Sequence, residues 1–321
     1  MTGTERDILS TPEILRQTLA HVAAERAVLA AMPWDRPVLF LGCGSSYWVG
    51  VAAASLYERQ RSLPAQALFA SDYRPRPEWL HLAISRTGQT TEVVEAMRLA
   101  RAAGAPVALL VGERGSAAEA HADAVLHLPF APERGIVQTR FISAALTALR
   151  VLIEEDVTAL AGLPEAARHA LDTFDPAPLS RFDHVVFLGR AERYGLARLA
   201  GLNLQETALL PAEGHQTLDY RHGPIALAAP GSLVWCFDPA SDAATMAVLD
   251  DVRRTGATVH QAAGEPLLSL IQAQLVAVRQ AERRGLDPDA PRHLSRAVVL
   301  ASSGDQFNDP AGLHLSGPSH S

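Results

Sequence analysis

Short apolar runs that end at a glycine divide the chain into two similar halves. The run that begins at Val38 stops at Gly42 and leads into a helix-like stretch, and the segment Val185–Tyr194 repeats the pattern of Val38–Tyr47 at an offset of 147 positions. Four apolar residues before a glycine and a helical stretch are typical of a buried parallel strand followed by a tight turn into a helix. The repeat therefore predicts two duplicated α/β units.

Strand-like runs alternate with helical patterns in both halves. Such alternation predicts βαβ crossovers and parallel sheets that are covered by helices on both faces. In the first half we expect further strands at Ala65–Ala70, Leu82–Ser85, Val107–Gly112 and Ala124–Phe130, and helices at Gln89–Ala103 and Gln138–Glu155. In the second half we expect strands at His184–Arg190, Ser232–Asp238 and Val259–Ala263, and helices at Ala191–Ala208, Ser241–Arg254 and Pro266–Arg284.

A stretch with several glycines and prolines, Leu160–Ser180, lies between the halves. Because such residues interrupt regular structure, we expect the domain boundary there. The first domain then comprises residues 1–163, including an N-terminal helix, and the second comprises residues 164–300. Residues 301–321 are rich in Ser, Gly, Asp and Pro, and we expect them to form a loosely ordered tail.

The composition points to a small-molecule substrate. The formal net charge of −7, from 35 acidic and 28 basic residues, gives no overall attraction for nucleic acid or an anionic membrane. The two cysteines cannot form a disulfide framework, and the N-terminus lacks the apolar region of a signal peptide, so we expect a cytoplasmic protein. No apolar run approaches the ~20 residues that a membrane-spanning helix needs.

The chain contains no lysine, so all 28 basic residues are arginine. Schiff-base aldolases, pyridoxal-phosphate enzymes and Walker-type nucleotide loops all need a lysine amine. These three classes are therefore excluded.

Two hydroxyl-rich loops follow neighbouring predicted strands. Gly42–Ser46 comes after the first strand, and Ser85–Thr90 comes after the strand that includes Leu82–Ile84. Hydroxyls and backbone N–H groups at a helix N-terminus bind anions, and ligands of open parallel sheets bind at the carboxyl ends of the strands. Each loop alone could be a plain helix cap, but the pair predicts a phosphate site.

The first loop differs from the dinucleotide-binding fingerprint. That fingerprint requires a third glycine where this chain has Tyr47, so a nicotinamide-dependent dehydrogenase is a weaker alternative. The second copy of the loop carries Arg190, Glu192 and Arg193 in place of small and hydroxyl residues. We therefore expect the phosphate site in the first half.

Glu206 and His222 are candidates for moving protons. Glu206 stands near the end of the helical pattern Leu196–Ala208, where apolar surroundings could raise its pKa, although a solvated helix-end glutamate is the alternative. His222 precedes a Gly-Pro turn in Tyr220–Pro224, which predicts a loop position suited to proton transfer. The motifs of zinc proteases and serine hydrolases are absent from the sequence.

Taken together, these segments resemble the sugar isomerase (SIS) domain family, specifically its double-SIS group, which includes the isomerase half of glucosamine-6-phosphate synthase. The resemblance extends from about Glu13 to Val299. It implies two tandem SIS domains, each a flavodoxin-like α/β/α sandwich with a parallel sheet. The matching segments are Gly42–Tyr47, Ser85–Thr90, Gln138–Arg140, Phe187–Arg190, Leu204–Glu206, Tyr220–Pro224 and Asp287–Arg292.

The resemblance also implies roles for individual residues. Glu206 would move a proton between C1 and C2 of a sugar phosphate, and His222 would open the sugar ring. In relatives this histidine reaches into the neighbouring subunit's site, so a homodimer is implied, with no metal and no organic cofactor. The implied phosphate-binding residues are Gly44, Ser45, Ser46, Ser85, Arg86 through its main chain, Thr87 and Thr90, with Gln138 and Thr139 nearby.

Two positions depart from the synthase-like pattern. Asn203 and Arg296 stand where those relatives carry lysines, and both are candidate substrate-binding residues. The chain also opens without a glutaminase-like segment, so we expect an amino-sugar or hexose 6-phosphate isomerase of the deaminating type. Because Asn203 carries no charge to stabilise an enolate, a sugar-phosphate-binding module without turnover is the alternative.

Overall fold

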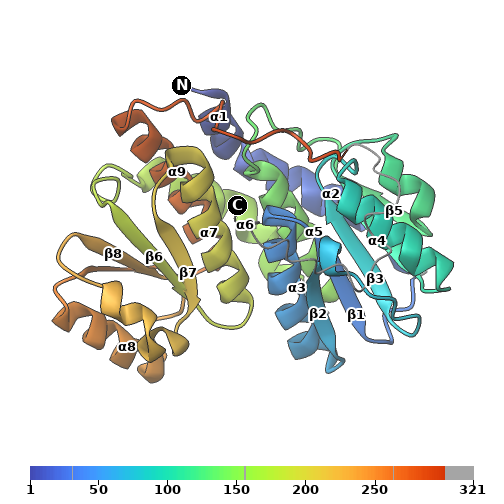
Figure 1. Ribbon diagram of the computed structural model, residues 1–321, viewed down its shortest axis with the longest axis horizontal. Coiled ribbons are helices and arrows are strands. Elements are labelled where there is room, and N and C mark those ends of the chain that lie inside the picture. The colour runs from blue at the N-terminus through green and yellow to red at the C-terminus, as the bar shows by residue number, and fades with distance from the viewer. Residues whose placement is uncertain (31, 155–156, 263, 301–321) are drawn as a thin grey trace, which may run out of the picture.

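Two parallel β-sheets form the framework of the protein (Figure 1). The computed structural model describes residues 1–30, 32–154, 157–262 and 264–300. The first sheet has five strands in the order β2-β1-β3-β4-β5, and the second has four in the order β7-β6-β8-β9. The strands are β1 Val38–Gly42, β2 Ala65–Phe69, β3 Leu80–Ser85, β4 Val107–Val111, β5 Ala124–His127, β6 His184–Gly189, β7 Ala212–Gln216, β8 Ser232–Cys236 and β9 Thr258–Gln261.

Helices fill the space between the sheets and cover their outer faces (Figure 1). α3 and α5 from the first half pack with α7 and α9 from the second half. One continuous apolar core includes Phe40 of the first sheet, Phe187 of the second and Leu199 between them, so the two halves share their main core. The helices are α1 Gly3–Leu9, α2 Thr11–Ala30, α3 Ser45–Arg61, α4 Thr91–Ala102, α5 Arg140–Ile153, α6 Leu163–Thr173, α7 Glu192–Ala208, α8 Ala243–Arg254 and α9 Pro266–Arg283.

The turns that begin α3 and α7 have the same backbone conformation. Gly44 precedes α3 with φ 53° and ψ −127°, and Ala191 precedes α7 with φ 51° and ψ −129°. Each preceding strand ends at a glycine whose absent Cβ leaves room for the first turn of the helix, since a Cβ on Gly42 would lie 2.7 Å from the carbonyl carbon of Ser46. The sequence repeat thus corresponds to a repeated strand-turn-helix element.

α3 and α7 cross in close contact and run antiparallel. A Cβ on Gly195 of α7 would lie 2.7 Å from the backbone N of Ala52 and from the carbonyl O of Trp48, both in α3. Beyond this contact, Arg59 at the end of α3 pairs with Glu192 at the start of α7 at 3.2 Å. The carboxyl end of α7 therefore lies toward the amino end of α3.

The structure departs from the sequence-based expectations in several elements. The stretch Leu160–Ser180, where a domain boundary was expected, contains the unexpected helix α6, whose Leu163 and Ala167 are buried in the shared core. The strand β7 was not expected, because its sequence AEGHQ is polar, as suits an edge strand. Two helices, α1 and α2, stand where one N-terminal helix was expected.

The remaining strands and helices agree with the predicted ranges to within about two or three residues at most ends. β5 is shorter than expected, since it ends at His127 and not at Phe130. The predicted tail, residues 301–321, lies outside the described residues. None of the described helices combines the length and the apolar character needed to cross a membrane.

We expect Gly195→Ala to destabilise the fold by roughly 2 kcal/mol, because the new methyl group would meet backbone atoms that cannot rotate away. This cost exceeds the gain of about 1 kcal/mol that alanine brings to a helix interior. Urea unfolding measures the difference. The control is Gly162→Ala, where the backbone is helical and no atom lies within 4 Å of the new Cβ, and where a change within about 0.5 kcal/mol is expected. Equal unfolding midpoints for both variants would contradict the close packing of α3 on α7.

Candidate active site

A small polar cavity lies at the carboxyl ends of β1 and β3. These strands are neighbours in the first sheet, so the loops that follow them meet at one edge. The cavity has a volume of about 30 Å³, which is room for one or two water-sized groups. Its polar lining comprises Cys43, Ser46, Ser85, Arg86, Thr87, Thr90, Gln138 and Arg296.

Most of the expected phosphate-binding residues meet at this cavity. Gly44, Ser45 and Thr139 are not part of its lining. Gly44 instead forms the turn before α3, and the Thr139 hydroxyl donates to the carboxylate of Glu133 at 3.0 Å. The hydroxyl groups that face the cavity therefore come from both expected loops.

Two helices begin near the cavity without a side-chain cap. α3 begins after Gly44, which has no side chain to cap it, and the side chain of Thr90 makes no capping hydrogen bond to α4. The N–H of Ser46 in α3 donates to the carbonyl oxygen of Cys43 at 3.1 Å, and that of Thr91 in α4 donates to the carbonyl oxygen of Val298 at 3.2 Å. The attraction for an anion therefore comes mainly from the dipoles of the two helices. Ser46 is buried on the first turn of α3. This arrangement suits the binding of a phosphate group.

The second loop is shaped by a glycine in a left-handed conformation. Gly88 has φ +63°, and its N–H donates to the Ser85 hydroxyl oxygen at 3.0 Å. A Cβ at Gly88 would lie only 2.2 Å from the Ser116 hydroxyl oxygen, so a larger residue could not take this position. The hydroxyls of Ser85 and Thr87 are thereby held at the start of α4.

Arg86 joins the cavity to the C-terminal segment of the chain. Its guanidinium is buried and donates to the carbonyl oxygens of Ile136 at 2.7 Å and Arg296 at 2.6 Å. Arg296 in turn pairs with Glu113 at 2.5 Å. The segment that follows α9 therefore crosses back from the second half to the first half over the site (Figure 1). The side chain of Arg86, and not only its main chain, takes part in the site.

Glu206, on the last turn of α7, has the properties of a general base. Burial raises the pKa of Glu206 from its ordinary value of 4.5 to about 7, while the charge of Arg86 and a hydrogen bond from Asn203 act in the opposite direction. A base with a pKa near 7 is available at neutral pH and still binds a proton strongly. The side chain is half-buried and is not part of the cavity lining, but the charge of Arg86, which does line the cavity, acts on it.

Asn203 positions the groups around Glu206. It is buried, and its amide nitrogen donates to the carbonyl oxygen of Gln138 at 3.3 Å. Its amide oxygen accepts a hydrogen bond from Gln274 of α9 at 3.1 Å. Asn203 is not part of the cavity lining, so the structure places it among protein partners and not in the position expected for a substrate contact.

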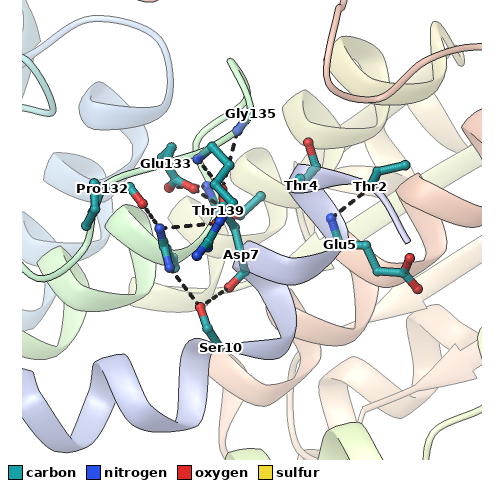
Figure 2. Close-up of polar contacts among 12 residues, drawn as sticks. Thr2, Thr4, Glu5, Asp7, Ser10, Pro132, Glu133, Gly135 and Thr139 are labelled. Atoms are coloured by element: carbon teal, nitrogen blue, oxygen red, sulfur yellow. Dashed lines mark hydrogen bonds and ion pairs between the residues drawn. The ribbon is translucent and has the colours of Figure 1, made fainter.

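Glu133 is a second buried carboxylate close to the site, which the sequence analysis did not identify. Its Oε1 accepts from the backbone N–H groups of Thr139 and Phe141, both at 2.8 Å, and thereby caps α5 (Figure 2). Burial raises the pKa of Glu133 to about 7, and the nearby Asp7 contributes in the same direction. No motif signals this residue, because its role depends on a contact with the helix that begins after the loop.

The helix α1 holds the segment that carries Glu133 and Gln138. Asp7 is fully buried and accepts from the backbone N–H of Arg134 at 2.5 Å and of Gly135 at 3.3 Å (Figure 2). Asp7 also pairs with Arg140 of α5 at 3.2 Å. The N-terminal helix therefore supports one wall of the site from behind.

Within the described ranges of the chain, no hydrogen bond or ion pair joins Glu206 to His222 or Cys43. His222 is exposed on a short 3-10 helix after β7 and is not part of the cavity lining. Burial raises the pKa of Cys43 to about 11, so its thiol is neutral and a poor nucleophile at neutral pH. Among the described residues, no group of three or more His, Cys, Asp or Glu side chains could hold a metal ion.

The corresponding turn of the second half is already occupied by a carboxylate. The backbone N–H of Arg190 donates to Asp238 at 3.0 Å, and the guanidinium of Arg190 pairs with Asp242 at 2.5 Å. Thr217 and Thr245 also donate to these carboxylates. An external phosphate would be repelled there, which agrees with the expectation that the phosphate site lies in the first half.

The fold and the cavity define an α/β protein with a hydroxyl-lined cavity at the carboxyl edge of its first parallel sheet. Residues 35–155 match the SIS domain family, so the chain contains an SIS domain, and the expected family resemblance is confirmed. The structure of glucosamine-6-phosphate deaminase from Thermotoga maritima is similar, with a TM-score of 0.77 and 26% identity over 93% of this chain and 100% of that one. Tagatose-6-phosphate ketose/aldose isomerase from Escherichia coli, with a TM-score of 0.80 and 18% identity over 90% of this chain and 95% of that one, shares the fold.

Among curated relatives, glutamine–fructose-6-phosphate aminotransferase (isomerizing) from Symbiobacterium thermophilum is 29% identical over 88% of this chain. The matched region is 54% of that relative's length. The chain therefore spans about half the length of the curated relatives that it matches.

Burial of Glu206 predicts a specific dependence of stability on pH. Between pH 4.5 and about 7 the unfolded chain releases this proton while the folded chain retains it, so the free energy of unfolding falls as the pH rises through this window. We expect Glu206→Gln to remove this loss, which makes the variant more stable than the wild type at pH 8 by on the order of 1–3 kcal/mol and equal to it near pH 4.

Urea unfolding at several pH values measures this difference. Glu78→Gln, at an exposed loop position, controls for the loss of one formal charge and should show no such trend. A Glu206→Gln variant whose stability parallels the wild type from pH 4 to pH 8 would show that Glu206 titrates normally.

Proposed function

We propose that the protein is a phosphosugar isomerase that acts on an amino-sugar or hexose 6-phosphate. The observation that carries this proposal is Glu206, a carboxylate with a pKa of about 7 that feels the charge of Arg86, a residue of the hydroxyl-lined cavity. The names of the similar proteins agree with it, since they include a glucosamine-6-phosphate deaminase and an isomerizing fructose-6-phosphate aminotransferase.

In this proposal the cavity, Glu206 and Arg86 have separate roles in the reaction. The cavity would hold the phosphate and so orient the sugar, which supplies much of the rate advantage of a positioned reaction. Glu206 would remove the proton from C2 of the open-chain aldose and return it to C1 through an enediol or enolamine. Arg86, whose charge already acts on Glu206, would stabilise the negative charge that develops.

We propose the deaminating form of this reaction as the physiological one. Glucosamine 6-phosphate and water would then give fructose 6-phosphate and ammonia, through an enolamine that becomes an imine and is hydrolysed. The likeness to the Thermotoga maritima deaminase, which extends over that whole chain, supports this choice. An ammonia assay with glucosamine 6-phosphate separates deamination from simple isomerisation.

His222 would open the sugar ring in the site of a neighbouring subunit. Its exposure in the single chain and its separation from the cavity lining support this role, because a homodimer would bring it to the partner's Glu206. The second half, residues 164–300, would be a second SIS domain. The common strand order about β1 and β6 and the matching turns at Gly44 and Ala191 support this division.

One observation favours a second candidate function, a sugar-phosphate-binding module without turnover. Asn203 is neutral and fully engaged with protein groups, so it offers no cation to an enediolate. Such a module would bind hexose phosphates but exchange no proton with solvent.

Incubation in heavy water distinguishes the two functions. We expect the wild type to incorporate deuterium at C2 of glucosamine 6-phosphate or a hexose 6-phosphate, as followed by NMR, because the enediol exchanges with solvent. Glu206→Gln should bind the substrate with similar affinity and lose exchange by about 10²-fold or more.

Ser46→Ala is the contrasting variant, since it should weaken phosphate binding by roughly tenfold through loss of a hydrogen bond to a charged group. Ser55→Ala, farther along the same helix, is the matched control. Exchange that persists at the wild-type rate in Glu206→Gln would refute the role of Glu206, and binding without any exchange in the wild type would favour the module.

Mixing inactive variants tests the shared site. If Glu206 and His222 act from different subunits, then equal amounts of Glu206→Gln and His222→Asn, allowed to exchange subunits, should recover about a quarter of the wild-type activity, because half of the dimers contain one intact site of two. If both residues acted from one subunit, each mixed dimer would combine two defective sites and no activity would return.

A further inference from the structure

The α3–α7 pair has two ends, and the second end also encloses a cavity. One end carries Ser46 and Glu206 at the candidate active site. At the repeat offset of 147 residues, Arg193 corresponds to Ser46, and Arg59 corresponds to Glu206. These two arginines line a cavity of about 240 Å³ at the opposite end of the helix pair. α9 contributes Pro266 and Leu267 of its first turn to this cavity, whereas the first cavity takes Gln138 from the segment just before α5. The larger cavity therefore occupies the position in the second half that corresponds, by the repeat, to the candidate active site of the first half.

The lining of this cavity combines an apolar floor with a balanced set of charges. Its floor includes the leucines Leu56, Leu149, Leu196 and Leu267, together with Ala53. Three arginines and three glutamates also line it, so its formal charge is zero. A ligand of this cavity should therefore present apolar surface over the floor and carry no large net charge.

The charged side chains form two separate groups, one with a net positive charge and one with a net negative charge. On the α3–α7 side, Arg59 and Arg193 share the single carboxylate of Glu192, each at 3.2 Å. On the α5–α9 side, Arg150 lies between two carboxylates, with Glu154 at 2.7 Å and Glu265 at 3.0 Å. One side of the cavity thus has an excess positive charge and the other an excess negative charge.

A donor on the positive side lacks a partner. The Nε–H of Arg193 is buried and makes no hydrogen bond to any part of the chain that the structure describes. A buried donor without a partner costs free energy, and an anionic group of a ligand would satisfy it. On the negative side, an ammonium group would balance the two glutamates around Arg150.

We propose that this cavity binds a small zwitterion with an apolar body, which is the chemistry of a free amino acid with an apolar side chain. The carboxylate would lie near Arg193 and Arg59, the ammonium would lie near Glu265 and Glu154, and the side chain would cover the leucine floor. A sugar phosphate fits less well, because Glu192 repels a dianion and the leucines offer nothing to sugar hydroxyls.

Calorimetric titration of the full chain tests the proposal directly. The probes are L-leucine and L-phenylalanine, compared with 4-methylpentanoate, which lacks the amine, and 3-methylbutylamine, which lacks the carboxylate. We expect at least one of the amino acids to bind, and each single-charge analogue to bind at least about tenfold more weakly, because each lacks one charge-assisted contact. Equal binding of an analogue, or no binding of either amino acid at about 10 mM, would overturn the proposal.

Variants place the binding in this cavity. Arg193→Gln should weaken binding by about tenfold or more, and Ala53→Met should abolish it by filling the floor. Arg98→Gln, on the outer helix α4, controls for the loss of an arginine and should bind like the wild type. Ser46→Ala, which affects only the phosphate site, should also bind like the wild type, so this test is independent of the proposed isomerase activity. Wild-type affinity in both cavity variants would place any binding elsewhere and overturn the assignment.

Discussion

The close antiparallel packing of α3 against α7 determines where every group of the candidate site lies. Gly195 permits backbone contact between the two helices, and no other residue could do so without moving them apart. Because the helices run in opposite directions, the last turn of α7 reaches the first turn of α3. A carboxylate from the second half is thereby brought under the influence of Arg86, which lines the cavity of the first half. Neither half contains the complete site.

Two carboxylates near the cavity have similar pKa values and different roles. Glu133 and Glu206 are both raised to about 7 by burial. Glu133 is held by two backbone N–H groups and a hydroxyl, which fix it as the cap of α5. Glu206 is half-buried and has the side chain of Asn203 as its hydrogen-bond donor and Arg86 as its nearby charge. Burial therefore raises the pKa of both carboxylates, but Glu133 has a structural role as a helix cap, whereas Glu206 is available for the proposed chemistry.

The absence of lysine shapes the electrostatics of the site. Arg86 and Arg296 are the cations at the cavity, and a guanidinium stays protonated at any pH the protein meets. These residues can hold an anion or stabilise developing charge, but they cannot exchange protons with a substrate. Within one chain, the proposed proton transfer is therefore assigned to Glu206. The C-terminal segment that carries Arg296 is held to Arg86 by a 2.6 Å hydrogen bond.

The sequence predicted most of the strands and the two hydroxyl-rich loops because their signals are local. Apolar runs that end at glycines mark β1 and β6, and the hydroxyl clusters after β1 and β3 meet at one cavity as expected. The edge strand β7 was not predicted because its residues are polar, and α6 was not predicted because prolines lie in and around its sequence. Glu133, Gln274 and the buried role of Asn203 could not be predicted, since each depends on contacts between segments far apart in the chain.

Burial, with Arg86 and Asn203 as polar neighbours, turns Glu206 into a base suited to neutral pH. The most direct test of this claim is a carbon-13 NMR titration of the glutamate carboxyl groups in the folded protein, with Glu206→Gln used to assign the resonance. The account predicts a midpoint of about 7 for Glu206. A midpoint near the ordinary value of 4.5 would contradict it, because a carboxylate that ionises there is solvated and is not held in the environment described for this site.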